Sequence, residues 1–406
     1  MLLDEREAIP GELTVHAADG LASVAPQEWD GLVGPGQGAL RHGYMTAWER
    51  VQLAGLRSRP LLAREGTDGR LVAAAPGYFY ELDVSCMKQG HPPAWLSRLR
   101  RVNDRLLKFR VFEVGCPVAL CPPLLHAPDL SIAEAAQVLL PEAAAEADRG
   151  EAHVLVVQDF PHPGGACAEI LEASGLAPVP VMPTVTMDLG FGSFEHYLDS
   201  MRASYRRRAR RALEQSSGLT VELRHDFAEL AGELAGLARM VFDRAGEIRR
   251  EILTEEYFAA ASAQEALSVL LLRRADGSLA CFGLLMDDRP WLHFLNCGFG
   301  EAAGREEGAY FRLLYEIVRA GIERGYAQIN FGLTTVAPKL DVGGSSVPLL
   351  AFIRYHRPMI QGLCAVGGRR LMAGKSSEAR HVFKDGAPPG ESVSPAEALV
   401  QASIRP

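Results

Sequence analysis

A glycine-rich turn that leads into an amphipathic helix is the first stretch of this 406-residue sequence with the pattern of a binding site. The turn follows an alternating, aromatic-rich segment at 291–299, and it contains Gly298, Gly300, Gly304 and Gly308. The first N–H groups of a helix lack partners within the helix, and the helix dipole adds partial positive charge there. The pattern therefore predicts a strand, a turn suited to a phosphate or another anion, and a helix.

A run of arginines forms a second candidate site. It comprises Arg202, Arg206, Arg207, Arg208, Arg210 and Arg211 on one predicted helix. The guanidinium group offers phosphates and carboxylates a bidentate fork. Two interpretations remain open: an anionic partner, or a surface helix that faces acidic patches of the same chain.

The composition is that of a soluble globular protein, with 48% hydrophobic and 23% charged residues. The length predicts more than one domain. The formal net charge of −8 argues against a surface that is basic throughout, so any nucleic-acid contact would be a local patch. The acidic start and the lack of long apolar runs lead us to expect a cytoplasmic protein with no membrane partner.

The cysteines and histidines do not have the spacing of metal ligands. The seven cysteines are scattered without a C-x-x-C pair, and the 11 histidines never occur as H-x-x-x-H. We therefore expect neither a metal ion nor a disulfide framework.

The predicted elements follow the same order in both halves of the chain: strand, two helices, hairpin, strand, helix, strand. In the first half, strands are expected at 13–17, 59–64, 71–80, 111–119, 152–158 and 184–189, with helices at 22–32, 42–54, 130–148 and 166–174 and an irregular, basic stretch at 86–110. In the second half, one long helix from Ser193 to about Gln215 precedes strands at 219–223, 268–274, 279–286, 291–299 and 328–331 and helices at 227–245, 255–263 and 310–322. This order indicates a duplication, with mixed, mostly antiparallel sheets joined by a crossover helix.

The order of elements in residues 219–357 resembles the GNAT acyltransferase fold, with the segment at 291–299 in the place of its splayed central strand. The acyl-CoA loop of that family reads Gln/Arg-x-x-Gly-x-Gly/Ala. Here Arg305-Glu306-Glu307-Gly308-Ala309-Tyr310 matches the first two fixed positions and has Tyr310 at the third. The bulky phenol would crowd a pyrophosphate, and the two glutamates would lie unfavourably beside it.

Four further segments resemble the Fem-type (FemAB-like) branch of GNAT proteins: SMRASYRRRARRALEQ, INFGLTTVAPKLDVGG, LRHGYMTAWERVQLAG and DGRLVAAAPGYF. This resemblance implies an α/β fold of two tandem GNAT-like domains, each with a mixed sheet flanked by helices. We expect an N-terminal domain on the acceptor side at 1–190, a C-terminal domain with the acyl-transfer cleft at 191–374, and a loosely structured tail at 375–406.

The resemblance also implies transfer of an acyl or aminoacyl group to an amine, in secondary metabolism or in a pathway like cell-wall biosynthesis. The expected co-substrate is acyl-CoA or an acyl carrier protein, with a small-molecule amine as acceptor and no permanently bound cofactor. One alternative is a Fem-type transferase that uses aminoacyl-tRNA. In the tRNA and carrier-protein cases, Arg206, Arg207, Arg210 and Arg211 would contact the partner. Another alternative is a non-catalytic tandem-GNAT binding protein.

The resemblance places three groups of site residues. The catalytic group is His293 as general base, Asn296, and Tyr310 as proton donor. The donor group is Cys297, Gly298, Phe299, Arg305, Gly308, Ala309 and Lys339, and the acceptor group is Asn330, Gly332, Arg354 and Tyr355. A hydrogen-bonded core histidine at 293, a packing role for Tyr310 and a packed thiol at Cys297 are the structural alternatives.

Overall fold

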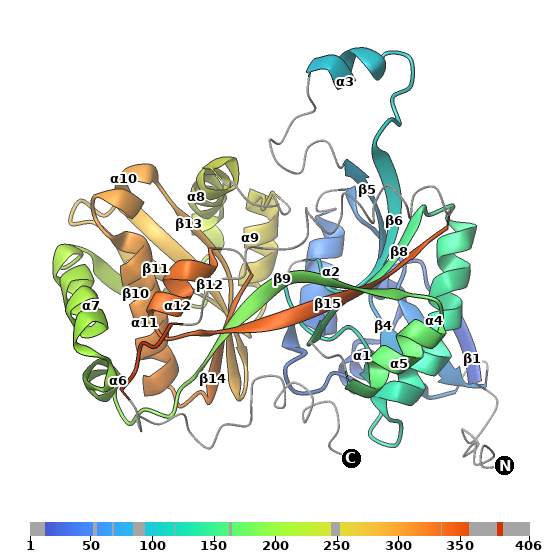
Figure 1. The fold of residues 1–406 in the computed structure, drawn as a ribbon, viewed down its shortest axis with the longest axis horizontal. Coiled ribbons are helices and arrows are strands. Elements are labelled where there is room, and N and C mark those ends of the chain that lie inside the picture. The colour runs from blue at the N-terminus through green and yellow to red at the C-terminus, as the bar shows by residue number, and fades with distance from the viewer. Residues whose placement is uncertain are drawn as a thin grey trace.

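A computed structural model describes residues 13–51, 55–66, 69–83, 94–117, 119–161, 165–244, 252–333, 335–356 and 380–384. An 11-stranded mixed sheet runs through both halves of this structure (Figure 1). Its strands in spatial order are β10 (Thr220–Arg224), β11 (Leu267–Arg273), β12 (Leu279–Asp288), β13 (Trp291–Phe299), β14 (Gln328–Gly332), β9 (Ala177–Asp188), β15 (Ser345–Tyr355), β8 (Val154–Pro161), β6 (Lys108–Val114), β5 (Gly77–Asp83) and β2 (Arg57–Ser58). The pairs β13–β14 and β6–β8 are parallel, and the other neighbours are antiparallel.

A smaller sheet belongs to the first half alone. It consists of β1 (Leu13–Ala17), β3 (Leu61–Glu65), β4 (Leu71–Ala75) and β7 (Leu125–His126). The strand predicted at 71–80 is divided at Pro76, with β4 in this sheet and β5 in the large one. Proline has no N–H to give to a ladder, so the division falls where the chain leaves one sheet for the other.

The two halves exchange their last strands. β9 ends the first half but pairs with β14, with Asp188 opposite Gln328. β15 ends the second half but pairs with β8, with Ile353 opposite Val156. β9 and β15 also pair with each other at the centre of the sheet. This symmetric exchange and the repeated order of elements give the fold its tandem form.

Helices cover both faces of the second half. The helix α11 (Ala309–Glu323) lies on one face, whereas α8 (Ala231–Arg244) and α9 (Glu255–Ser262) lie on the other. The predicted apolar stripe of α11 is confirmed, since Leu313 and Ile317 are completely buried against the sheet. No helix in the described part of the chain is long and apolar enough to cross a membrane.

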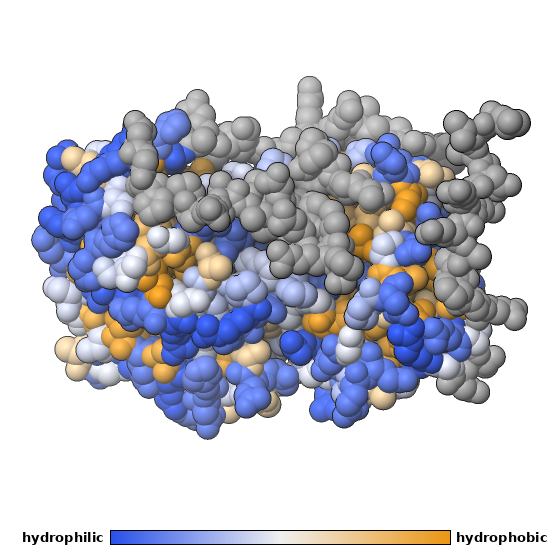
Figure 2. Space-filling model, turned by 90° about the horizontal axis from the view of Figure 1, so that it is seen from below, coloured by the Kyte–Doolittle hydropathy of each residue, from blue (hydrophilic) through white to orange (hydrophobic). Residues whose placement is uncertain are grey.

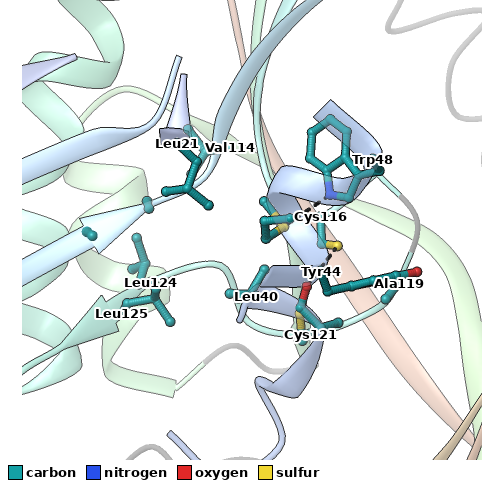
Figure 3. Packing of buried hydrophobic residues seen from close by; sticks show 14 of the residues in the cluster. Leu21, Leu40, Tyr44, Trp48, Val114, Cys116, Ala119, Cys121, Leu124 and Leu125 are labelled. Carbon is teal, nitrogen blue, oxygen red and sulfur yellow. Dashed lines mark hydrogen bonds between the residues drawn. The ribbon is translucent and has the colours of Figure 1, made fainter. Parts of the chain in front are cut away.

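The core of the first half is built from helices α1 (Pro26–Asp30), α2 (His42–Arg50), α4 (Ile132–Arg149) and α5 (Gly165–Ala173) and the loops beside them. Ser131 begins α4 with a capping box to Glu134. Leu40 and Tyr44 lie beside Cys116 and Cys121, which come from the loop after β6 (Figure 3). A hydrogen bond that the Cys121 thiol donates to Cys116 and burial both hold the pKa of Cys121 well above its usual range.

The long helix predicted from Ser193 to Gln215 is instead two helices, α6 (Phe194–Ser200) and α7 (Ala203–Gln215). Met201 and Arg202 between them are extended. Met201 is completely buried and forms a β-bridge to Phe383, and the Arg202 N–H donates to the Val382 carbonyl at 2.9 Å. A tertiary contact therefore breaks the helix, and sequence periodicity carries no sign of it.

Two other expectations change in the structure. Residues 380–384, part of the expected loose tail, pack against α6, and the Phe383 ring lies 5.3 Å from that of Phe191. The rest of the expected tail, and the Asp68 turn of the first hairpin, lie outside the described residues. The strand expected at 184–189 extends over 177–188, because pairing with β15 holds its proline-rich first half extended.

Candidate active site

The parallel strands β13 and β14 separate after three residue pairs (Figure 1). The last pair is His293 opposite Asn330. Beyond it, β13 continues to Phe299, while β14 ends at Gly332 and leads into α12 (Val336–Asp341). Where neighbouring strands separate, their backbone groups no longer pair with each other and become available to a ligand.

A β-bulge on β13 contributes to this separation. Leu284 of β12 lies opposite Asn296, and Leu285 lies opposite Phe294, so Leu295 is the extra residue. The bulge changes which alternate residues of β13 face α11. As a result, Cys297 lies on the α11 side together with Phe294. A bulge bends its strand and increases the local twist.

The end of β14 has a matching irregularity. Gly332 has φ +71°, a left-handed conformation that is strained for other residues, and a Cβ there would lie 3.4 Å from the Phe294 carbonyl oxygen. The Asn330 side-chain oxygen accepts hydrogen bonds from Thr184 Oγ1 and the Gly332 N–H, both at 2.9 Å. Asn330 therefore holds the turn that leads β14 away from β13.

Lys339 of α12 is buried beside this turn. Its Nζ donates to the carbonyl oxygens of Gly332, at 3.3 Å, and Leu333. Burial raises the pKa of the nearby Cys297 thiol to about 11, and the Lys339 charge opposes part of the rise. At neutral pH the thiol is protonated and a poor nucleophile, so Cys297 serves as a wall of the site.

The predicted anion loop joins α10 (Glu301–Arg305) to α11. Gly308 has φ +65° and caps α11. The Tyr310 ring stacks on Phe299, with centroids 5.2 Å apart, and so ties the start of the helix to the end of β13. The side chain of Gln215, at the end of α7, lies over Gly308 and donates to the Glu306 carbonyl at 2.6 Å.

Two charged residues at this loop, Arg305 and Glu307, form ion pairs within the protein. Glu307 accepts from Arg274, which lies 2.9 Å away in the turn between β11 and β12. Arg305 extends into solvent and pairs with Glu301 at 3.0 Å. The Glu307 charge is thereby compensated, which reduces the repulsion that the sequence predicted for an anion at this loop.

His293 lies on the opposite face of β13 and is 8% exposed. Its Nε2 is 3.3 Å from Asp288 Oδ2, which also accepts the Gly38 N–H from the first half at 2.9 Å. In the neutral tautomer that carries its proton on Nε2, the ring donates to the Asp288 carboxylate and keeps a lone pair on Nδ1. The arrangement suits a proton acceptor at the junction of the two halves.

Asp288 and Thr184 are the two residues of this region that the sequence interpretation missed. Asp288 precedes the tight turn at 289–290 and pairs with Trp291 across it. The hairpin pattern in the sequence was therefore sufficient to predict that Asp288 lies near His293. Thr184 had no such signal, since it reaches Asn330 only through the exchange of β9.

The structure does not bring all the predicted residues to the site. Arg354 and Tyr355 lie opposite Leu155 and Val154, in the first half, because β15 crosses to pair with β8. Arg354 lies 3.9 Å from Asp148 there. They are thus separated from the cleft at β13 and β14.

The four arginines of α7 that were predicted to contact a tRNA or carrier protein divide into two groups. Arg206 donates to the carbonyls of Asp199 and Met201 at the end of α6, and Arg210 lies 3.6 Å from Asp199. Arg207 and Arg211 are exposed, and no ion pair links either of them to another described residue. The first two arginines have structural contacts, and the other two remain available to an anionic partner.

The corresponding parallel strands of the first half, β6 and β8, stay paired up to the last residue of β6. β6 and β8 pair from Val111–Val154 to Val114–Val157. The Glu113 carboxylate lies beside them and accepts hydrogen bonds from Tyr80 Oη at 2.7 Å and from Gln158.

A cavity of about 310 Å³ lies elsewhere, at the end of β13 that pairs with β14, and is lined by residues that include Arg41, Glu265 and Leu292. Among the described residues, no group of His, Cys, Asp and Glu side chains is placed to hold a metal ion.

Residues 199–337 match the family model described as an acetyltransferase (GNAT) domain. The chain is 26% identical over 306 residues to the putative 8-amino-7-oxononanoate synthase 2 of Mycobacterium tuberculosis, in two strains. That match covers 71% of this chain and 38% of the length of the relative.

Two solved structures are similar to most of the chain. FemX superimposes with a TM-score of 0.52 at 14% identity, covering 84% of this chain and 98% of FemX. A tandem GNAT protein from the clavulanic acid biosynthesis pathway superimposes with a TM-score of 0.48 at 13% identity, covering 86% and 99%. The family match includes β13, the separated strands and α11, and the likeness to FemX extends over both halves. Residues 199–337 therefore match the model of a GNAT domain, and the chain shares the overall fold of FemX.

Proposed function

We propose that this protein is an N-acyltransferase that moves an acyl or aminoacyl group from acyl-CoA or an acyl carrier protein to the amine of a small molecule. The separation of β13 and β14 after His293 and Asn330 is the observation that carries this proposal. It leaves backbone N–H groups of β13 free to polarise a donor carbonyl, as in an oxyanion hole. The GNAT domain match covers this region.

The two faces of β13 have different proposed roles, one in donor binding and the other in acceptor binding. On the α11 face, the loop at Gly308 and Ala309 would receive the donor phosphates, and Cys297, Gly298 and Phe299 would border its carbonyl end. On the other face, the His293–Asp288 pair would receive the acceptor amine. Asn330, Gly332 and Lys339 would maintain the opening between the faces.

The reaction is a direct attack of the amine nitrogen on the donor carbonyl carbon. A C–N bond forms, and the C–S bond of the thioester breaks after the tetrahedral intermediate. Nδ1 of His293 accepts the proton that the amine loses, and Tyr310 at the start of α11 supplies a proton to the departing thiolate. Asn296 positions the acceptor, and holding the reactants together supplies much of the rate enhancement.

Aminoacyl-tRNA is the second candidate donor, and the exposed side chains of Arg207 and Arg211 favour it. A tRNA contact there would weaken steeply with salt, because each phosphate contact releases counterions. Acyl transfer would then break a C–O ester bond instead of a C–S bond.

A binding and transfer experiment separates the candidates. Coenzyme A should raise the thermal unfolding midpoint, and acyl-CoA should acylate an amine in a panel read by mass spectrometry. If only charged tRNA binds, and Arg207→Gln with Arg211→Gln abolishes that binding while Arg239→Gln on α8 does not, the donor is aminoacyl-tRNA. Binding of neither donor, and no acylated product with acyl-CoA, an acylated carrier protein or charged tRNA, would refute the proposed transferase.

A further inference from the structure

The hairpin of β5 and β6 projects from the body of the molecule and carries α3 (Ala94–Leu99) at its tip (Figure 1). We define the tip as residues 95–107. Five of the eight large hydrophobic side chains that are exposed in the described chain lie within it: Trp95, Leu99, Val102, Leu106 and Leu107. Val102 is 91% exposed and Trp95 is 59% exposed. Such a concentration on a projecting element indicates a contact surface.

The tip is an ordered structure. The Arg100 guanidinium donates to both Asp83 carboxylate oxygens at 2.6 and 2.8 Å and to the Leu106 carbonyl at 2.9 and 2.7 Å. Lys108 pairs with Glu81 at the base of the hairpin at 3.0 Å. Leu96 is completely buried and faces inward. These contacts hold the apolar side chains of the tip in an outward position.

Positive charge accompanies the apolar residues. Arg98, Arg101 and Arg105 are exposed, and none of them forms an ion pair with a residue in the described ranges. Asp104 is the one acidic residue in the sequence of the tip, although the whole chain carries a net charge of −8. Aromatic and aliphatic side chains interspersed with arginine are typical of segments that lie in the interface of a lipid bilayer.

We propose that the tip docks on an anionic lipid bilayer. Its apolar side chains enter the boundary between headgroups and acyl chains, and Arg98, Arg101 and Arg105 contact the lipid phosphates. The narrow, projecting shape suits insertion into a deformable surface. Two other partners fit the tip less well. A second copy of this chain would bring three more unpaired arginines against the first three, which would repel them. A nucleic acid would contact the arginines but would leave Val102 and Leu107 in water.

The position of the tip is compatible with the cleft. The tip projects at the same end of the molecule as α10, which follows β13 (Figure 1). The opposite end, seen in Figure 2, shows hydrophilic residues along the edges of its described surface and hydrophobic patches between them. A bilayer at the tip would therefore face the end toward which β13 runs. The docking itself does not depend on the reaction proposed above.

Vesicle co-sedimentation tests the docking. The wild-type chain should bind vesicles of phosphatidylcholine with phosphatidylglycerol more tightly than vesicles of phosphatidylcholine alone. The triple variant Trp95→Ser, Leu99→Ser and Val102→Ser should lose at least about tenfold in vesicle affinity. The variant Arg98→Gln, Arg101→Gln and Arg105→Gln should lose about fivefold per arginine on anionic vesicles and much of the salt dependence.

Two matched controls assign the effect to the tip. Arg239→Gln removes exposed charge from α8, and Met240→Ser removes an exposed apolar side chain from the same helix. Both should bind vesicles like the wild type. Circular dichroism and the unfolding midpoint should be unchanged in all variants, since the substituted side chains are exposed.

Three results would overturn the docking proposal. The first is a wild-type chain that stays in the supernatant with anionic vesicles. The second is a serine variant that binds as tightly as the wild type. The third is a change in solution mass between wild type and serine variant, by light scattering without lipid, which would assign the tip to self-association.

Discussion

Replacing His293 by glutamine is the most direct test of the division of roles across β13. His293 is almost completely buried, and its Nε2 donates to Asp288 Oδ2 at 3.3 Å. A glutamine amide can still donate to this carboxylate, but it has no lone pair that can accept a proton from an amine. The variant therefore removes the proposed base and retains a partner for Asp288.

The expected magnitudes follow from these contacts. A positioned general base contributes roughly 10²- to 10⁴-fold, so kcat should fall by that factor, equivalent to about 3–5 kcal/mol of activation free energy. The KM for the donor should change little, because the proposed donor site lies on the other face of β13. The free energy of unfolding should fall by no more than about 1 kcal/mol, since Asp288 retains the Gly38 N–H.

The assay is steady-state transfer to the accepted amine, with denaturant unfolding measured in parallel. His16→Gln, at an exposed position on β1, is the control for histidine loss. His293→Ala is a second variant, and it should cost about 1–3 kcal/mol of stability because it removes one partner of a buried carboxylate. An unchanged kcat in His293→Gln, with the stability loss confined to His293→Ala, would show that the histidine only links the two halves.

Three further predictions concern backbone conformation, thiol reactivity and pH. Gly332→Ala should lower the free energy of unfolding by about 1–2 kcal/mol, because φ +71° is left-handed, and a normal midpoint in urea would contradict the assigned turn. Cys297 should react with iodoacetamide very slowly at neutral pH and faster as the pH approaches its pKa of about 11; Cys297→Ser supplies the background rate, and rapid neutral-pH alkylation of Cys297 would refute the buried thiol. Burial lowers the pKa of His356 despite the nearby Asp148, so the unfolded chain binds the proton more tightly. The free energy of unfolding should therefore decrease as the pH falls below about 6.5. This decrease should be smaller in His356→Gln. Identical pH profiles of stability for the two proteins would contradict the lowered pKa of His356.

The best predicted region is the strand, turn and helix at 291–323. Its pattern is local: alternation in β13, glycines in the turn and the apolar stripe of α11 all appear within one stretch. The repeated order of elements could also be predicted from local patterns, because each helix or strand has its own hydrophobic periodicity. The GNAT-like fold followed from that order.

The placement of the acceptor-side residues could not be predicted in the same way. Arg354 and Tyr355 follow the predicted final strand, yet β15 crosses to β8 and carries them into the first half. Periodicity identifies a strand and its faces but not its neighbour. The break between α6 and α7 has the same origin, since a segment more than 170 residues away holds Met201 and Arg202 extended.

The sequence by itself determined the kinds of elements, their order and the chemical character of the turn at Gly308, because these depend on residues close together in the chain. Only the tertiary structure decided which groups meet. The exchange of β9 and β15 brings Thr184 to Asn330, and the contact between the halves brings Gly38 to Asp288 beside His293. These pairings depend on contacts between distant segments, whose energies are set by packing and burial and not by local periodicity.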